Sequence, residues 1–353
     1  MIEFNLLKLS NLKLKASKLK EIIIENKDLL EEKEFFNKLI ANKILTKEQV
    51  LLSERKVNIK NQIRALQDHK VKIITVLSKE YPEPLKEIED APPILYCKGN
   101  LFSDDSNAIA IIGTRKATDY GRTVARNLAK ELSERGITII SGLASGIDTQ
   151  AHLGALLSGG RTIAVMGTGI DFVYPPSNRN LAKKIVENGA LLTELPPNSP
   201  ALPYHFPSRN RIISALSKAV IVVEASLQSG VFSTVRWALE YGKDVYAVPG
   251  DINRKSSMGT NELLKNGAFP LTSYEDLLNN TKLSVKEKEE KRIPALDEKE
   301  QKLFEVLNTM PKSIDLLVKE VGYTPQVVIA TLASLEIKGL VRELPGKRFI
   351  KEE

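Results

Sequence analysis

The stretch from Ala108 to Gly250 constrains the fold of this chain more than any other part. It contains four apolar, β-branched runs that each stop at Gly or Ser and pass into a helical pattern: AIAIIGTRKATDYGR, TIISGLASGID, TIAVMGTGID and VIVVEASLQSG. Strands that alternate with helices predict a parallel sheet with right-handed crossovers and helices on both faces. Open sheets of this kind bind ligands at the carboxyl ends of their strands, where these glycine-bearing turns fall.

The fold class that follows is α/β, with an extended Rossmann-like, doubly wound and mainly parallel sheet. Strands are expected at 108–112, 137–141, 161–166, 190–194, 219–224 and 244–248. Helices are expected at 120–135, 147–158, 178–188, 208–217 and 231–242. Because Pro92 and Pro93 cannot sit in a central strand, the segment ILYCKG that follows them is expected to be an edge or capping element.

The rest of the chain predicts separate domains. Residues 1–70 contain neither glycine nor proline and carry apolar residues at helical spacing, which predicts an all-helical, SAM-like domain before a core of residues 71–278. Residues 279–295 are charged and predict a linker. Residues 296–353 show three helical patterns and then two short strands around a Pro-Gly turn, which is the winged-helix pattern. Such a unit serves either DNA binding or protein contact.

Composition limits where in the cell the protein is expected and which kinds of site it can contain. The formal net charge of +7 favours an acidic partner, although a lysine-rich composition explains it equally well. No apolar run approaches the roughly 18 residues of a membrane span, and the first residues lack the order of a signal peptide. A cytoplasmic protein without membrane contact is expected. Cys97 is the only cysteine and the three histidines lie far apart, so neither an internal disulfide nor a metal site is expected.

The first turn of the core disfavours a dinucleotide cofactor. A Rossmann fingerprint has three glycines after the first strand and an acidic residue at the end of the second strand. Here the turn reads Gly113-Thr114-Arg115-Lys116, and the second strand ends at Ser141-Gly142 without an acidic residue. We therefore expect no cofactor.

The same turns predict a site for a polyanion. A glycine turn before a helix presents free N–H groups to an anion, and HFPSRNRIISALS places an aromatic residue beside arginines, which suits base stacking with phosphate contacts. Arg209 and Arg211 cannot share one helical face, so one is expected to bind phosphate and the other to brace a carboxylate such as Glu194 or Glu224. The alternative is that the turns are structural, Phe206 is core and the arginines form internal ion pairs. The predicted DNA-binding residues are Gly113, Thr114, Arg115, Lys116, Ser141, Gly142, Gly146, Gly167, Thr168, Gly169, Phe206, Arg209, Asn210 and Arg211.

A catalytic site is not expected. Ser145, Asp148 and His152 are close in sequence, but no G-x-S-x-G or H-E-x-x-H pattern accompanies them. Asp148 is better explained as accepting hydrogen bonds from loop amides, and His152 as helix packing.

Several motifs together resemble the DprA (DNA-processing protein A, or Smf) family over about residues 71–278: GTRKATDYGR, SGLASGIDTQAH, GTGIDFVYPPSN, TELPP, HFPSRNRIISALS, VVEASLQSG and VPGDI. The resemblance implies a non-enzymatic core that binds single-stranded DNA, forms a homodimer and helps to load the RecA recombinase during natural transformation. It also implies a DNA pocket built from Arg115, the 141–142 and 167–169 turns, Phe206 and residues 209–211.

Some features depart from that family, and two other functions remain open. Residues 229–235 read SGVFSTV where the family usually has SGSLITA, and the N-terminal segment lacks a Gly-containing hairpin. A Rossmann-like nucleotide phosphoribohydrolase would fit the glycine turns, but EASLQSGVFSTVRWALE lacks the P-G-G-x-G-T of those enzymes. The winged helix would also fit a transcription regulator.

Overall fold

The computed structural model describes residues 1–12, 14–56, 58–285, 296–308, 311–344 and 346–351. The chain divides into two compact units, residues 1–288 and 289–353. Within the described residues, no helix combines the length and the apolar character that crossing a bilayer would require.

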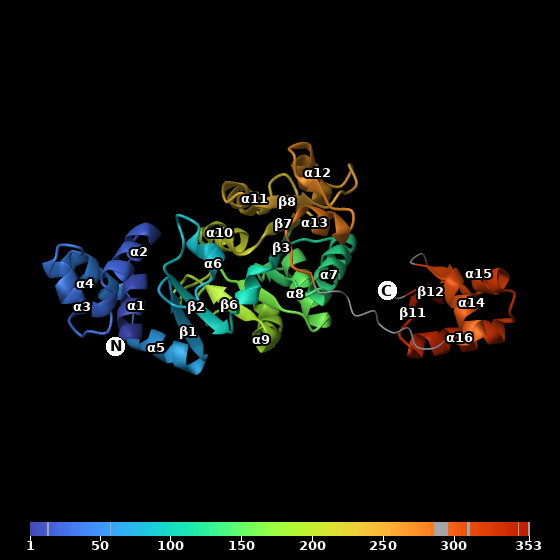
Figure 1. Ribbon diagram of the computed structural model, residues 1–353, viewed down its shortest axis with the longest axis horizontal. Coiled ribbons are helices and arrows are strands. Elements are labelled where there is room, and N and C mark those ends of the chain that lie inside the picture. The colour runs from blue at the N-terminus through green and yellow to red at the C-terminus, as the bar shows by residue number, and fades with distance from the viewer. Residues whose placement is uncertain (13, 57, 286–295, 309–310, 345, 352–353) are drawn as a thin grey trace. The chain divides into compact units, whose positions relative to one another are not determined.

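The larger unit is built on one mixed sheet. Within the described residues its strand order is β1-β2-β6-β5-β4-β3-β7-β8-β9, in which all neighbours from β6 to β9 are parallel and β2 pairs antiparallel with β1 and β6 (Figure 1). The mainly parallel, doubly wound sheet is confirmed. The strands are β1 Val71–Thr75, β2 Ile94–Gly99, β3 Ala108–Ile112, β4 Thr138–Ser141, β5 Thr162–Val165, β6 Ala190–Thr193, β7 Ala219–Val222, β8 Asp244–Ala247 and β9 Phe269–Pro270.

Helices cover both faces of this sheet (Figure 1). Side chains alternate along β3: Ile109 and Ile111 pack in one apolar cluster with α7 and α8, and Ala110 and Ile112 pack in another with α10 and α11. This is the period-two alternation of a strand that is buried on both faces. The helices of this part are α6 Glu83–Lys86, η2 Ser103–Ser106, α7 Asp119–Glu134, α8 Ile147–Leu157, η3 Pro176–Asn178, α9 Arg179–Asn188, α10 His205–Leu216, α11 Val231–Glu240, α12 Lys255–Lys265 and α13 Tyr274–Asn280.

The expectation that ILYCKG forms an edge is wrong. This segment is β2, which lies between β1 and β6, and β1 forms the edge. The two prolines come just before β2 rather than inside it, so they remove no donor from its ladder. Pro93 instead accepts a hydrogen bond from Val76 N at 3.1 Å, which extends the pairing with the edge strand.

Within the described part of residues 1–70, the chain forms helices that pack onto the sheet. Their buried apolar side chains belong to the same cluster as Tyr96 of β2 and Leu191 of β6. Ser10 Oγ lies 2.7 Å from Tyr96 Oη, and Gln62 donates to Pro197 O at 2.9 Å. The helices are α1 Ile2–Ser10, α2 Ala16–Glu25, η1 Lys27–Leu29, α3 Phe35–Ala41, α4 Lys47–Lys56 and α5 Ile59–Asp68. A domain boundary near residue 70 therefore stays a proposal.

The smaller unit has the winged-helix architecture. Its elements are α14 Glu298–Val306, β10 Lys312–Ser313, α15 Ile314–Val321, α16 Pro325–Ile337, β11 Val341–Leu344 and β12 Arg348–Lys351. Thr324 precedes α16 and Pro325 occupies its first turn, where a proline is compatible with a helix. The short β10, which pairs with β12, was not predicted. Of the proposed linker, residues 286–295 lie outside the described residues, whereas Ser284 is hydrogen-bonded to Asn107 of the larger unit.

Candidate nucleic-acid interface

A pocket of about 530 Å³ lies at the carboxyl edge of the sheet. β3 has β4 on one side and β7 on the other, so the order in which strands are added to the sheet reverses at this point. Doubly wound sheets bind their ligands at such a switch point. The pocket is lined by residues of the segments 112–115, 144–148, 201–213 and 226–234, together with Tyr174.

Arg115 is presented by a firmly held loop. Thr114 N donates to Glu224 O at 2.7 Å, and the buried Glu224 carboxylate accepts from Thr118 N at 2.9 Å and from Thr118 Oγ1 at 2.6 Å. On the other side of the loop, Gly146 has a φ of +83°, and a Cβ there would overlap the carbonyl oxygens of Thr114 and Arg115. The loop backbone is therefore fixed, while the Arg115 side chain is exposed.

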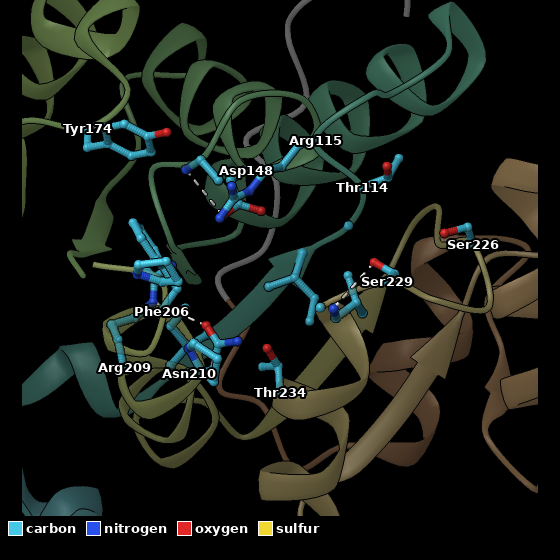
Figure 2. A pocket seen from close by; sticks show the side chains of 18 of the residues that line it. Thr114, Arg115, Asp148, Tyr174, Phe206, Arg209, Asn210, Ser226, Ser229 and Thr234 are labelled. Atoms are coloured by element: carbon cyan, nitrogen blue, oxygen red, sulfur yellow. Dashed lines mark hydrogen bonds between the residues drawn. The ribbon is translucent and has the colours of Figure 1, made fainter. Parts of the chain in front are cut away.

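Aromatic rings stand beside Arg115 on one side of the pocket (Figure 2). Arg115 Cζ lies 5.2 Å from the centre of the Phe206 ring, within cation–π range. The Tyr174 and Phe206 rings are 5.7 Å apart between centroids, and Tyr174 is 42% exposed. A smaller cavity of about 140 Å³ adjoins these three side chains. This wall offers positive charge and ring faces together.

The opposite side of the pocket carries hydroxyl groups on Ser226, Ser229 and Thr234 (Figure 2). Asn210, which also lines the pocket, donates to Ser233 Oγ at 2.7 Å. This wall has hydrogen-bonding groups without formal charge. The two walls together suit a ligand that combines an anion, an aromatic ring and hydroxyl or ether oxygens, as a nucleotide does.

Arg209 and Asp148 lie at the base of the pocket and are both nearly buried. Asp148 accepts hydrogen bonds from Gly142 N at 3.1 Å and from Ala144 N at 3.3 Å, which confirms the predicted bonding to loop amides. Burial lowers the pKa of Arg209 to about 10; Asp148 opposes that shift and Arg115 adds to it. Arg209 is therefore positively charged at neutral pH, and it lies close to a second positive charge, that of Arg115.

Arg211 does not line the pocket. Its guanidinium contacts Glu194 at 2.6 Å and Asp90 at 2.9 Å, and the side chain is buried. Burial acts to lower the pKa of Arg211, but these carboxylates outweigh it and the net pKa is raised. Of the two carboxylates that the sequence offered as partners, Glu194 pairs with Arg211, while Glu224 holds the Thr118 amide and hydroxyl.

The predicted DNA-binding residues fall into two groups, according to whether they line a cavity. Gly113, Thr114, Arg115, Phe206, Arg209 and Asn210 line the larger cavity, and Gly142 lines the smaller one. The others line neither cavity: Lys116, Ser141, Gly146, Gly167, Thr168, Gly169 and Arg211.

Packing accounts for several members of the second group. Ser141 Oγ donates to Ile111 O at 2.7 Å, and Thr168 Oγ1 donates to Phe172 O at 2.6 Å. A Cβ on Gly167 would lie 2.8 Å from Phe206 Cδ1, so this glycine lets the ring rest on the backbone. These residues support the pocket from behind, and a direct role for them in binding DNA stays a proposal.

Sequence reasoning missed Tyr174 and the hydroxyl-bearing wall. Tyr174 belongs to the stretch VYPPSN after the third core strand, and Ser226 and Ser229 belong to the stretch ASLQSG before α11. Both stretches follow strands of the parallel sheet, so their place at the carboxyl edge was predictable. The direction in which their side chains point could not be predicted.

His152 is a buried neutral histidine. Thr162 Oγ1 donates to Ile139 O, so His152 Nδ1 donates to Thr162 Oγ1 at 2.7 Å, and Nε2 has no partner among the described residues. Burial, with a smaller effect of Arg209, lowers the pKa of His152 to about 3. The side chain packs inside the fold, as predicted, and does not line the pocket.

Acid is therefore expected to destabilise the wild type more than His152→Gln. Below the ordinary pKa of 6.5 the unfolded chain binds a proton that the folded chain does not. The free energy of unfolding of the wild type should thus fall, relative to the variant, by about 1.4 kcal/mol per pH unit from pH 6.5 towards 4. Urea unfolding of both proteins across this range measures the difference. Parallel pH profiles would show that His152 is protonated in the folded state.

Comparison with known proteins identifies the family. The sequence model of "DNA recombination-mediator protein A" matches residues 72–282, and that of the "DprA winged helix domain" matches residues 287–347. The chain is 35% identical to Protein Smf of Escherichia coli K12 over 311 residues, which cover 86% of this chain and 83% of that protein.

Two solved structures are also similar. DNA processing protein A (DprA) of Streptococcus pneumoniae has a TM-score of 0.68 and 33% identity, covering 80% of this chain and 98% of that one. DprA of Helicobacter pylori, whose structure is described as giving insights into a single-stranded DNA binding mode, has a TM-score of 0.53 and 34% identity, covering 59% of this chain and 94% of that one. The chain therefore belongs to the DNA recombination-mediator protein A family, the family of the DprA and Smf proteins.

Proposed function

We propose that this protein binds single-stranded DNA in the pocket at the switch point of the sheet. The observation that carries the proposal is the exposed Arg115 guanidinium over the Phe206 ring, at the edge where such sheets bind ligands. An unpaired strand offers a phosphate for the arginine and a base for the ring. The H. pylori relative, described as binding single-stranded DNA, supports the choice of ligand.

The proposal extends to a biological role. Membership of a recombination-mediator family supports a cytoplasmic, non-enzymatic, homodimeric protein that protects incoming single strands and helps to load a RecA recombinase during natural transformation. We further propose the domain division 1–70, 71–278, 279–295 and 296–353. The ends of the two matched family models, at residues 282 and 287, support the boundary between the core and the winged helix.

Arg115→Gln is expected to weaken binding to oligo-dT by roughly 10- to 100-fold, because a charged hydrogen bond contributes about 1.5–3 kcal/mol. One phosphate fewer would be neutralised, so the slope of log K against log salt should shrink by about 0.7. Fluorescence anisotropy at several salt concentrations measures both quantities. The same variant should lose its stimulation of RecA-filament formation on the strand.

Lys184→Gln provides the matched control, since Lys184 is an exposed cation on α9 that does not line the pocket. It should leave affinity and slope nearly unchanged. If Arg115→Gln binds like the wild type, or if both variants lose the same amount, the pocket is not the DNA site. Release of free base from nucleoside monophosphates would instead favour the phosphoribohydrolase.

A transcription regulator is less well supported by the winged helix. The helix that such domains place in the major groove is α16, whose sequence PQVVIATLASLEI contains no lysine or arginine. Its exposed residues include Ile329 at 51% and Ile337 at 89% exposure. This surface suits a protein contact better than base edges and phosphates. Sequence-specific duplex binding by this domain would contradict that interpretation.

A further inference from the structure

Two charged side chains hold one residue of the loop after β4. The Gly142 N–H donates to the Asp148 carboxylate at 3.1 Å, and the Gly142 carbonyl accepts from Arg209 Nη1 at 2.8 Å. A Cβ at this position would lie 2.6 Å from Arg209 Nη2 and 2.7 Å from Asp148 Oδ2. Gly142 thus lies between the two side chains, and a larger residue would fit only if one of them moved.

The two side chains come from different elements and join several loops. Asp148 stands in the first turn of α8 and also accepts from Ala144 N. Arg209 stands on α10, and its Nη1 also donates to Val165 O at the end of β5. The pair therefore ties α8 and α10 to the carboxyl ends of β4 and β5.

This arrangement connects directly to Arg115. The loop held at Gly142 and Ala144 continues to Gly146, where an added Cβ would lie 2.3 Å from Thr114 O and 2.7 Å from Arg115 O. The next amide, Ile147 N, donates to Thr114 O at 3.3 Å. A shift of the Gly142–Gly146 loop would move the backbone that presents the Arg115 side chain.

We infer that Asp148 and Arg209 form an internal brace that positions Arg115 for phosphate, and that Arg209 itself does not bind phosphate. The inference rests on the proposed function. The competing explanation is a direct contact, because Arg209 lines the pocket. Against it, the Arg209 side chain is only 5% exposed and its guanidinium is bonded to two carbonyl oxygens. A site of this kind works only if the groups behind it hold the contacting side chain in place.

Asp148→Asn separates the brace from simple electrostatics. Removing a negative charge beside a DNA site should strengthen binding if only charge matters. The brace predicts the opposite: a loss of roughly 10-fold or more, by analogy with the loss seen when groups that orient the ligands of a metal are removed. Asp119→Asn is the matched control. Asp119 is an exposed acid at the start of α7, just after the loop that carries Arg115, and it takes no part in the brace. It should leave affinity unchanged or raise it.

Arg209→Lys and Arg209→Gln test the same inference without relying on one variant's folding. A lysine keeps the charge but has a single nitrogen on a flexible stem, so it cannot make the Nη1 bonds to Gly142 O and Val165 O together with the Nε bond to Asn210 Oδ1. Both variants should therefore lose affinity to a similar extent. Because Arg115 would lose its position over the phosphate in both variants, their slopes of log K against log salt should shrink by the same amount, up to about 0.7. A direct phosphate contact by Arg209 predicts instead that the lysine variant keeps the wild-type slope and that only the glutamine variant lowers it. Binding is measured by anisotropy with oligo-dT below the melting transition of every variant.

Two outcomes would overturn the brace while leaving the proposed function intact. One is an Asp148→Asn protein that binds as tightly as the wild type or more tightly. The other is an Arg209→Lys protein with wild-type affinity beside an Arg209→Gln protein with a reduced salt slope. If the wild type itself does not bind oligo-dT, or Arg115→Gln binds normally, the proposed function fails instead.

Discussion

Replacing Arg211 with methionine is expected to lower the free energy of unfolding by about 3–5 kcal/mol, the cost of breaking a buried ion pair by removing one partner. The variant leaves Glu194 and Asp90 facing an apolar side chain in a partly buried site. Asp90 also accepts from Tyr241 Oη at 2.7 Å, so the loss reaches α11 as well as α10. Because Asp90 keeps some exposure to solvent, the lower end of the range is expected. Urea unfolding measures the change.

The double variant Arg211→Met/Glu194→Gln is the control for this prediction. It removes one of the stranded charges, so it should recover part of the lost stability. At temperatures where Arg211→Met is fully folded, its affinity for oligo-dT should stay close to that of the wild type, because Arg211 does not line the pocket. A stable Arg211→Met protein with weakened, less salt-dependent binding would show instead that Arg211 contacts phosphate.

The two arginines of the RNR sequence illustrate what the sequence could and could not predict. Their spacing excluded a shared helical face, so a division of roles was predictable. The structure turns both side chains inward: Arg211 pairs with carboxylates, and Arg209 bonds to carbonyl oxygens of two strand ends. Which side chain meets solvent depends on how α10 packs against the sheet, and no local pattern contains that information.

The strands and helices of the core were more predictable than the site. Each core strand is a short β-branched or apolar run between turn signals, and both faces of the sheet are covered, so local pattern and final burial agree. The segment ILYCKG shows the limit. Its prolines predicted an edge, but sheet position is set by β1, a separate segment that pairs outside it. Long-range pairing of this kind is not encoded in either segment alone.

The glycine turns show a similar limit at the site. A glycine after a strand is compatible with binding an anion and with close packing, and the sequence cannot distinguish them. In the structure, Gly146 and Gly167 pack against the Arg115 loop and the Phe206 ring. These contacts, together with the positive φ of Gly146, explain why glycine is required without any bound anion. The proposed anion binding is therefore assigned to Arg115, and the turns supply its surroundings.

Phe206→Ala is expected to weaken binding to oligo-dT by about 1–3 kcal/mol, the contribution of one base stacked on an aromatic side chain. The ring is uncharged, so the slope of log K against log salt should not change, which separates this variant from Arg115→Gln. Phe206→Trp keeps a ring face and should retain most of the affinity. Phe172→Ala serves as the matched control, because Phe172 is an exposed aromatic residue that does not line the pocket.

Stacking of a base on Phe206 can be tested by changing the DNA as well as the protein. An abasic strand keeps its phosphates but offers no ring, so it should bind the wild type and Phe206→Ala equally weakly. Duplex DNA should also bind the larger unit less tightly, because paired bases cannot reach Phe206. If Phe206→Ala instead lowers the affinity for normal and abasic strands by the same factor, the ring acts only by supporting Arg115, whose guanidinium lies 5.2 Å from its centre. A reduced salt slope in that variant would lead to the same conclusion, since the charge would then have lost its position over the strand.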